Sequence, residues 1–230
     1  MVNLIYYNIK NLNFTDYLSM KRCISKERRK KAEKYRHFED TVRCVLAEVL
    51  VAYGYYDCYH KIENFALEEN EYGKPFLISM PEFKYNISHS GEWVVVAYGD
   101  IDIGVDVEKI EGNWDSVYKK CLTEFDKVWV DRSDEISKNK KMAIIWTLKE
   151  AYLKYLGVGL FKAMDTFYVD FYNCTVVDES KALNVYTQSF DIENNYVCSI
   201  CCTNKEITKK REISQLDMCA FIKKYSTNSN

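Results

Sequence analysis

Residues 101–108 read Ile-Asp-Ile-Gly-Val-Asp-Val-Glu, and this stretch decides how the rest of the chain is interpreted. Apolar and polar residues alternate with a period of two, which predicts a β-strand with one face in a core. The opposite face then carries Asp106 and Glu108 side by side. Two such carboxylates repel each other unless they are solvated or hold a hard cation, and Mg²⁺ prefers oxygen ligands. The stretch therefore predicts a core strand whose polar face is a candidate metal site.

A second stretch, residues 146–154, supplies a third carboxylate. Ser137 is a suitable N-cap for a helix that ends at Gly157. Apolar residues recur along it at helical spacing. Another face of the same helix holds Ala143, Thr147, Glu150 and Lys154. Glu150 is therefore a candidate third metal ligand. Lys154, one turn further on, would hold a cation beside a metal-bound diphosphate.

Length and composition predict a globular protein. The chain has 230 residues, of which 47% are hydrophobic and 15% aromatic, enough for one large domain or two small ones. A net charge of −2 argues against nucleic acid or a membrane as a partner of the whole molecule. We find no signal pattern and no apolar run that could cross a bilayer. Nine scattered cysteines are typical of reduced thiols, so we expect a cytoplasmic protein.

Cys198, Cys201 and Cys202 resemble a C-x-x-C motif, but they fall in a segment that is typical of a strand. No second cysteine or histidine pair completes a zinc set. We interpret the three as residues of a core strand.

The N-terminal part of the chain contains a basic segment. Residues 21–36 hold nine Lys and Arg residues against two Glu, and Ser25 is a plausible N-cap for a helix. Such a segment is usually a solvated helix face, and the alternative is an anion site for a terminal phosphate. A second helix follows Asp40 with a clear core-facing stripe, and Gly54 is expected to close it. Arg43 lies off that stripe and is available for a ligand.

His89 is one of three histidines. We place it in a polar loop, residues 88–91, between an extended segment at 83–87 and an apolar strand at 93–98. A histidine in such a loop is either a surface residue or a donor to a phosphate oxygen. Each half of the chain thus reads as helix plus antiparallel strands, which predicts an α+β fold with residues 101–108 at the seam.

Four short motifs follow one another along the chain. They are Gly73-Lys74-Pro75, Ser88-His89-Ser90, G-x-D-x-E at residues 104–108 and W-x-x-K-E-A-x-x-K at residues 146–154. D-x-E alone is a weak signal, whereas the combination is specific. It resembles the 4′-phosphopantetheinyl transferases of the surfactin-synthetase-activating (Sfp) type. The resemblance covers the chain from the basic segment through Gly157.

The resemblance implies transfer of the 4′-phosphopantetheine arm of coenzyme A to a serine of an apo acyl or peptidyl carrier protein. Adenosine 3′,5′-bisphosphate would be released, and Mg²⁺ or Mn²⁺ would be required. It also implies two similar α/β halves, residues 1–100 and 101–230, in a pseudo-two-fold arrangement with the active site in the cleft between them. Such a chain would complete its site as a monomer. The alternatives are a non-catalytic module that binds coenzyme A or a nucleotide, and a metal-dependent phosphodiesterase or nuclease.

The matching positions imply a role for each candidate residue. The metal and the coenzyme A diphosphate would be held by Asp106, Glu108 and Glu150. Diphosphate oxygens would be neutralised by Lys154 and His89. Near the 3′-phosphate would lie Arg28, Lys31 and Lys74. The nucleotide pocket would be lined by Arg43 and Ser88. Glu150 is the candidate base for the serine proton, with Lys154 and His89 as the other catalytic candidates.

Two further positions and one segment stand apart from these roles. Many relatives carry a hydroxyl at the position of Cys44, so we do not expect the hydrogen bond of that hydroxyl here. Lys149 points partly toward the apolar stripe of its helix, and its role stays open. Residues 112–130, with Leu122, Phe125, Trp129 and Val130, either form an apolar platform for the carrier or fill the core of the second half.

Overall fold

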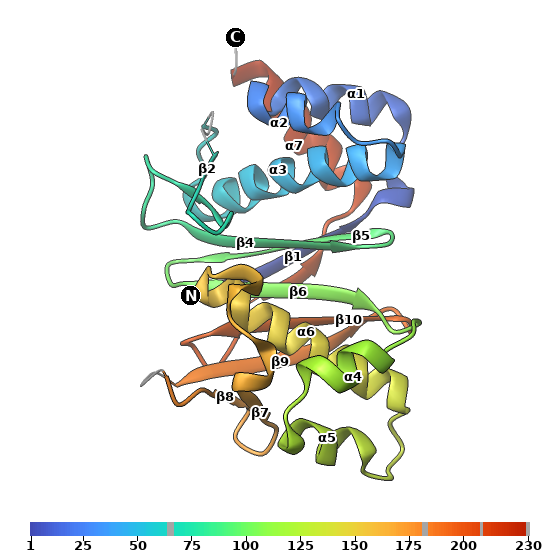
Figure 1. Cartoon of the computed structure of the whole chain (residues 1–230). Coiled ribbons are helices and arrows are strands. Elements are labelled where there is room, and N and C mark those ends of the chain that lie inside the picture. Colours follow the sequence, from blue (N-terminus) through green and yellow to red (C-terminus); the bar gives the residue numbers. More distant parts are fainter. Residues whose placement is uncertain (64–66, 181–183, 208, 229–230) are drawn as a thin grey trace.

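The computed structural model describes residues 1–63, 67–180, 184–207 and 209–228. Within them the chain forms four layers, which are helices, a sheet, a second sheet and further helices (Figure 1). In spatial order, the strands of the first sheet are β11 (Lys209–Glu212), β1 (Val2–Asn8), β5 (Trp93–Gly99) and β4 (Lys84–Ser90). Those of the second are β6 (Ile103–Lys109), β10 (Tyr196–Cys202), β9 (Val185–Ile192), β8 (Thr175–Val177) and β7 (Tyr168–Asp170).

Helices cover the outer face of the first sheet. They are α1 (Phe14–Cys23), α2 (Lys26–Ala32), α3 (Phe38–Tyr59) and α7 (Gln215–Asn228). The strand β5 shows why both faces of this sheet are apolar, because its residues alternate between two cores. Val94, Val96 and Tyr98 face the helices, while Trp93 and Val95 face the second sheet.

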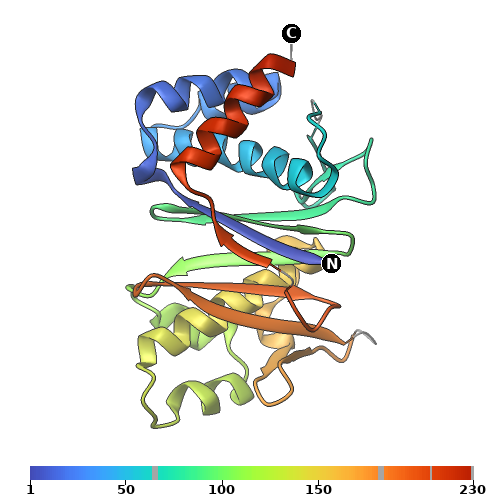
Figure 2. The ribbon, with the colours of Figure 1, turned by 180° about the vertical axis from the view of Figure 1, so that it is seen from behind.

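The end of the chain returns to the first sheet. Strand β11 pairs in parallel with β1, and α7, red in Figure 2, lies against α1 on the outer side of that sheet. The division into residues 1–100 and 101–230 stays a prediction, and residues 209–228 are packed with the first of these two segments.

The long helix α6 (Lys138–Leu156) lies on the outer face of the second sheet, across β6 and β10. Gly104 permits this close approach, since a Cβ atom there would lie only 1.8 Å from the carbonyl oxygen of Ala151. Ser137 caps the helix by accepting from the backbone N–H of Lys140, and Gly157 ends it with φ of +70°. Both predicted ends are thereby confirmed.

Polar side chains join the two sheets where β4 lies against β6. The side-chain oxygen of Asn86 accepts from the backbone N–H of Val105 at 2.9 Å. Two residues further along β4, the hydroxyl of Ser88 donates to Asp106 at 2.7 Å. Ser90 donates in the same way to Glu108 at 2.8 Å. The alternating polar residues of β4 therefore fix the acidic face of β6.

The remaining elements are short. Helices α4 (Asp115–Cys121) and α5 (Glu124–Asp131) pack beside α6, and β2 (Leu67–Glu69) pairs with β3 (Pro75–Leu77) in a hairpin. Three segments form single turns of 3-10 helix, which are η1 (Ile9–Asn11), η2 (Gly159–Phe161) and η3 (Met164–Thr166). No helix in the described ranges has the length and apolarity of a bilayer-spanning segment.

The structure confirms the α+β class and corrects two local predictions. Helix α3 does not end at Gly54 but continues to Tyr59, because the missing side chain of Gly54 makes room for the ring of Tyr98. His89 does not lie in a loop. Its backbone pairs with Val94 of β5, and the chain turns only at Gly91, where φ is +52°. Strand pairing overrides the preference of the Ser-His-Ser-Gly segment for a loop.

Candidate active site

A cavity of about 430 Å³ opens at the seam between the two sheets. Its walls come from α2, α3, the β2–β3 hairpin, β4, β6 and α6, so both segments of the chain contribute. Eight of the ten residues that the motifs single out line it: Arg28, Lys31, Ser88, His89, Asp106, Glu108, Glu150 and Lys154.

The three carboxylates meet at one end of this cavity. Asp106 is only 4% exposed, and its Oδ1 accepts from the Lys154 ammonium at 2.6 Å and from the Ser88 hydroxyl at 2.7 Å. Its Oδ2 is buried and has no partner in the described part of the chain. The convergence follows from the contact between Gly104 and Ala151, because that contact seats α6 directly on β6. Glu150, the residue before Ala151, is thereby brought to the cavity that Asp106 lines.

Burial and mutual repulsion raise the pKa of two of these carboxylates, Glu150 and Glu108. Burial raises the pKa of Glu150 to about 7, and the charges of Asp106 and Glu108 add to the effect, while Lys154 opposes it. Burial and the charge of Asp106 also raise the pKa of Glu108, against hydrogen bonds from Ser90 and Trp146. The single ammonium group of Lys154 does not balance the negative charge of three carboxylates.

The acidic cluster fits a hard cation in its chemistry. It offers carboxylate oxygens, one of them buried and unpartnered, in a concave site that a diphosphate could enter. In this structure, however, the carboxylates are not arranged as a complete metal site. Among the described residues, no three His, Cys, Asp or Glu side chains are arranged to hold a metal ion, and Lys154 occupies one oxygen of Asp106.

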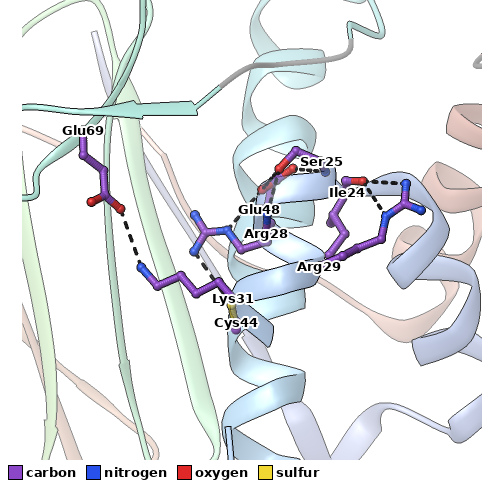
Figure 3. A network of polar contacts seen from close by, with 8 residues as sticks. All are labelled: Ile24, Ser25, Arg28, Arg29, Lys31, Cys44, Glu48 and Glu69. Carbon is purple, nitrogen blue, oxygen red and sulfur yellow. Dashed lines mark hydrogen bonds and ion pairs between the residues drawn. The ribbon is translucent and has the colours of Figure 1, made fainter. Parts of the chain in front are cut away.

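The cavity also has a basic wall, formed by Arg28 and Lys31 of α2, whose contacts are drawn in Figure 3. Arg28 is held by Glu48, whose Oε2 accepts from its Nε at 3.1 Å, and Glu48 also accepts from the backbone N–H of Ser25. The prediction that Ser25 caps this helix is confirmed by its bond from the Arg28 N–H. Lys31, one turn further along α2, is half exposed and lies 3.6 Å from Glu69 across the cavity. The two cations are thus fixed by one buried and one exposed carboxylate.

His89 lines the same cavity from β4. It is accessible from the cavity but surrounded by protein atoms, which lower its pKa, and the nearby charges of Arg43 and Lys154 lower it further. The imidazole therefore gives up its proton more readily than an ordinary histidine. An anion placed in the cavity would favour its charged form.

Two predicted residues lie outside this cavity. The Lys74 ammonium donates to the carbonyls of Tyr155 at 3.0 Å and Ile103 at 3.2 Å, where burial lowers its pKa to about 8. Arg43 faces a second cavity and donates to the carbonyl of Gly91 at 2.5 Å. These contacts tie Lys74 to the end of α6 and Arg43 to the end of β4. The structure does not bring either one together with Arg28 and Lys31.

Lys149 is a structural residue in this arrangement. Its ammonium lies 2.7 Å from Asp126 and donates to the carbonyls of Met164 and Phe167, and both charged side chains are fully buried. Asp126 in turn accepts from Thr123 in a capping box and from the backbone N–H of Val169. The pair joins α5, α6 and β7.

The apolar residues of the predicted carrier platform are mostly core. Leu122 and Val130 are buried beneath α6, and Trp129 stacks on Phe171 at 3.8 Å. Phe125 alone of the four is largely exposed, at 67%. The reading of Cys198 and Cys201 as core-strand residues is confirmed by their complete burial in β10.

Sequence reasoning missed two residues that shape the site. Glu48 was not singled out, although a carboxylate within the apolar run of α3 was a visible signal for a buried ion pair. Trp146 belongs to the apolar stripe of its helix and to the motif at residues 146–154, and no role at the site was predicted for it, yet it lines the cavity and hydrogen-bonds Glu108.

Two family models match the chain in succession. The model of the 4′-phosphopantetheinyl transferase superfamily matches residues 102–201, and the model of the N-terminal part of 4′-phosphopantetheinyl transferase matches residues 13–100. The boundary between the two matches, at residues 100–102, falls just before β6, the strand that brings Asp106 and Glu108 to the cavity.

Curated relatives extend over most of the chain. The 4′-phosphopantetheinyl transferase gsp of Aneurinibacillus migulanus is 28% identical over 90% of both chains. The 4′-phosphopantetheinyl transferase Sfp of Bacillus subtilis (strain 168) is 28% identical over 80% of this chain and 84% of its own. A more distant relative is the L-aminoadipate-semialdehyde dehydrogenase-phosphopantetheinyl transferase of Candida glabrata, at 23% identity over 72% of this chain and 69% of its own. On these matches the chain belongs to the 4′-phosphopantetheinyl transferase superfamily, among its Sfp-type enzymes.

Proposed function

We propose that this protein transfers the 4′-phosphopantetheine arm of coenzyme A to a serine of an apo acyl or peptidyl carrier protein, with release of adenosine 3′,5′-bisphosphate. The observation that carries the proposal is the cavity itself. It places the cations of α2 at one wall and three carboxylates from two distant motifs at the other. A nucleotide with a terminal phosphate and a diphosphate has charges that suit both walls.

The acidic wall is the proposed metal site. Asp106, Glu108 and Glu150 would hold Mg²⁺, or Mn²⁺, together with the coenzyme A diphosphate. The bound cation would stabilise negative charge on the diphosphate oxygens. Lys154 lies at Asp106 and is the nearest cation for an oxygen of the same diphosphate. His89 lines the same cavity and would donate to another oxygen of the diphosphate.

Glu150 is the proposed general base. The serine hydroxyl attacks the phosphorus that bears pantetheine, and the bond from this phosphorus to the bridging diphosphate oxygen breaks. The leaving group is adenosine 3′,5′-bisphosphate, and the serine proton passes to Glu150. A carboxylate with a pKa near neutrality suits this task, since it is partly ionised at pH 7 and is a stronger base than an ordinary glutamate.

The basic wall is the proposed site of the 3′-phosphate. Arg28 is preoriented by Glu48, and Lys31 is free to turn toward an anion because its bond to Glu69 is long and exposed. Ser88 lines the same cavity. Lys74 and Arg43 remain candidates for binding the nucleotide because they match the family pattern. Each side chain would first have to break its hydrogen bonds to backbone carbonyl groups.

We further propose that residues 1–100 and 101–230 act as two similar halves related by a pseudo-two-fold axis. The support is that one long helix covers each sheet, α3 on the first and α6 on the second. Because both walls of the cavity come from one chain, a monomer suffices for activity. A cytoplasmic location stays a prediction.

The experiment is a transfer assay with coenzyme A labelled in its pantetheine part, Mg²⁺ and a panel of apo carrier proteins from fatty acid, polyketide and peptide synthesis. We expect label on at least one carrier, and none when its acceptor serine is replaced by alanine. Binding of coenzyme A without transfer to any carrier would instead support a non-catalytic binding module. Hydrolysis of coenzyme A without a carrier would support a phosphodiesterase.

A further inference from the structure

The tip of the β2–β3 hairpin, residues 70–74, is built around the side chain of Asn70. Its amide oxygen accepts from the backbone N–H groups of Tyr72 at 3.0 Å and Lys74 at 2.8 Å. The backbone carbonyl of Asn70 accepts from the N–H of Gly73, which has φ of +85°. Asparagine suits such a turn because its short side chain can hydrogen-bond the backbone a few residues further on. The oxygen of this amide is therefore used within the hairpin.

The nitrogen of the same amide bonds outside the hairpin. It donates to the backbone carbonyl of Gly157 at 2.9 Å, across 87 residues of sequence. Gly157 ends α6 in the left-handed conformation. A Cβ atom there would lie 3.2 Å from the Asn70 nitrogen, so the glycine leaves room for the contact. One side chain thus shapes the turn and joins it to the helix that carries Glu150.

The hairpin tip supplies partners for backbone carbonyl groups at the end of α6. The last four carbonyls of a helix have no partner within it, and side chains commonly provide one. The Lys74 ammonium bonds to the carbonyl of Tyr155, and the Asn70 amide to that of Gly157. Among the described residues, the tip makes one other hydrogen bond outside the hairpin, from Lys74 to Ile103. Two of the three bonds therefore fasten the tip to the end of α6.

The hairpin is also part of the lining of the cavity at the seam. Glu69 and Pro75, which lie opposite each other in the β2–β3 pair, both line it, and so does Gly73 of the tip. Glu150 and Lys154 line the same cavity from α6. The contacts between the tip and the end of α6 therefore fix one part of the lining relative to another.

Asn70 is the link that would persist if Lys74 turned toward a nucleotide. In that event the Lys74 ammonium would release the carbonyls of Tyr155 and Ile103. The amide of Asn70 is uncharged and hydrogen-bonded at both ends, and Asn70 is not among the described residues that line the cavity. Its bond to Gly157 would then be the remaining hydrogen bond from the tip to α6.

We propose that Asn70 is a positioning residue, which holds the β2–β3 hairpin on the end of α6 and so keeps this wall of the cavity in place for the nucleotide. The inference rests on the proposed function for the identity of the ligand. Loss of the Asn70 amide weakens the binding of coenzyme A and leaves the chemical step nearly unchanged. The reason is that Lys154 keeps its own bonds to Asp106 at 2.6 Å and to Ser88 at 2.9 Å.

The test compares three variants by calorimetry with coenzyme A and by kcat of transfer at saturating coenzyme A. Asn70→Ala removes both contacts of the amide, whereas Asn70→Asp keeps an acceptor oxygen for the turn and loses the donor to Gly157. We expect both to raise the Kd of coenzyme A about three- to tenfold, the effect of one hydrogen bond, and to change kcat less than about twofold. Asn173→Ala is the matched control, because it removes an exposed hydrogen bond to Asp170 in the β7–β8 turn, and it should change neither value.

Amide hydrogen exchange tests the link without any ligand. Asn70→Asp should speed exchange of the Gly157 N–H at the end of α6 and leave the Lys74 N–H protected, because the turn keeps its acceptor. Asn70→Ala should speed exchange at both positions. Unchanged exchange at Gly157 in both variants would show that the amide does not hold the helix end, and the inference would be wrong.

Three binding results would also overturn the inference. One is a wild-type Kd in Asn70→Asp beside weaker binding in Asn70→Ala, since the shape of the turn alone would then matter. Another is an unchanged Kd in both Asn70 variants, whatever their kcat. The third is equal weakening in Asn173→Ala. A wild type that binds coenzyme A but transfers nothing would refute the proposed function alone, because the Kd values and exchange rates still decide the role of Asn70.

Discussion

The ammonium nitrogen of Lys154 lies 2.6 Å from Oδ1 of Asp106, and the second oxygen of this buried carboxylate has no partner among the described residues. One lysine thus faces three carboxylates that come from β6 and α6. Burial and repulsion shift the protonation of two of them, Glu108 and Glu150. The site carries an excess of negative charge, and this excess has consequences for stability that can be measured without any activity.

Replacing Glu150 should stabilise the metal-free protein. Its pKa in the folded state is about 7, above the unfolded value of 4.5, so the folded protein keeps a proton that the unfolded chain has lost. Stability therefore falls as the pH rises from 4.5 to 7. We expect Glu150→Gln to be more stable than the wild type by about 1–2 kcal/mol at pH 8, after allowance for solvent screening, and no more stable at pH 4.

The measurement is urea unfolding in the presence of a chelator at both pH values. Glu135→Gln, which changes an exposed carboxylate outside the cavity, is the control and should leave stability unchanged. Equal stability of Glu150→Gln and the wild type at pH 8 would show that the carboxylate is not strained by its neighbours.

Magnesium should stabilise the folded protein through the same cluster. At ten times its Kd a ligand of the folded state adds about 1.4 kcal/mol to the free energy of unfolding. We expect a rise in Tm of the wild type on addition of Mg²⁺ and none in Asp106→Asn, because the most buried of the three carboxylates is then lost as a charged ligand. The readout is thermal unfolding monitored by circular dichroism. The same rise in both proteins would place any bound Mg²⁺ elsewhere.

The buried pair of Lys149 and Asp126 should matter for folding and not for chemistry. Both side chains are fully buried, so Lys149→Met leaves Asp126 without its counter-charge and should cost about 3–5 kcal/mol. Asp126→Asn should also destabilise, and the double variant should lose less than the sum of the two. Urea unfolding measures each value.

The folded fraction of Lys149→Met should retain kcat/KM within a fewfold of the wild type. Neither Lys149 nor any of its three partners is among the described residues that line the cavity. A variant with native stability and severely reduced transfer would show that this lysine takes part in the reaction after all.

Local patterns were sufficient to predict the acidic strand and the helix that meets it. Alternation at residues 103–108 places Asp106 and Glu108 on one face, and Ser137 and Gly157 mark the ends of α6. These features depend on neighbours in sequence. The reason for glycine at residue 104 comes from the structure, where any side chain would collide with Ala151.

The positions of Lys74, Arg43 and His89 could not be obtained in this way. The Lys74 ammonium bonds to Tyr155, 81 residues away, and a long flexible side chain gives no sign in the sequence of which carbonyl it will reach. Arg43 likewise bonds across 48 residues to Gly91. His89 has a local context typical of a loop, and only its pairing with β5 makes it part of a strand. Each depends on tertiary contacts that local propensity does not encode.

The most direct test of the central claim is the rate at which Glu150→Gln transfers pantetheine from coenzyme A to a carrier that the wild type modifies, measured by mass spectrometry with saturating Mg²⁺. Glu135→Gln serves as the matched control. We predict that the variant folds, binds coenzyme A and transfers at least on the order of 100-fold more slowly than the wild type, while the control is unaffected. Transfer by Glu150→Gln at the wild-type rate would contradict the assignment of this carboxylate, and with it the catalytic centre described at the seam.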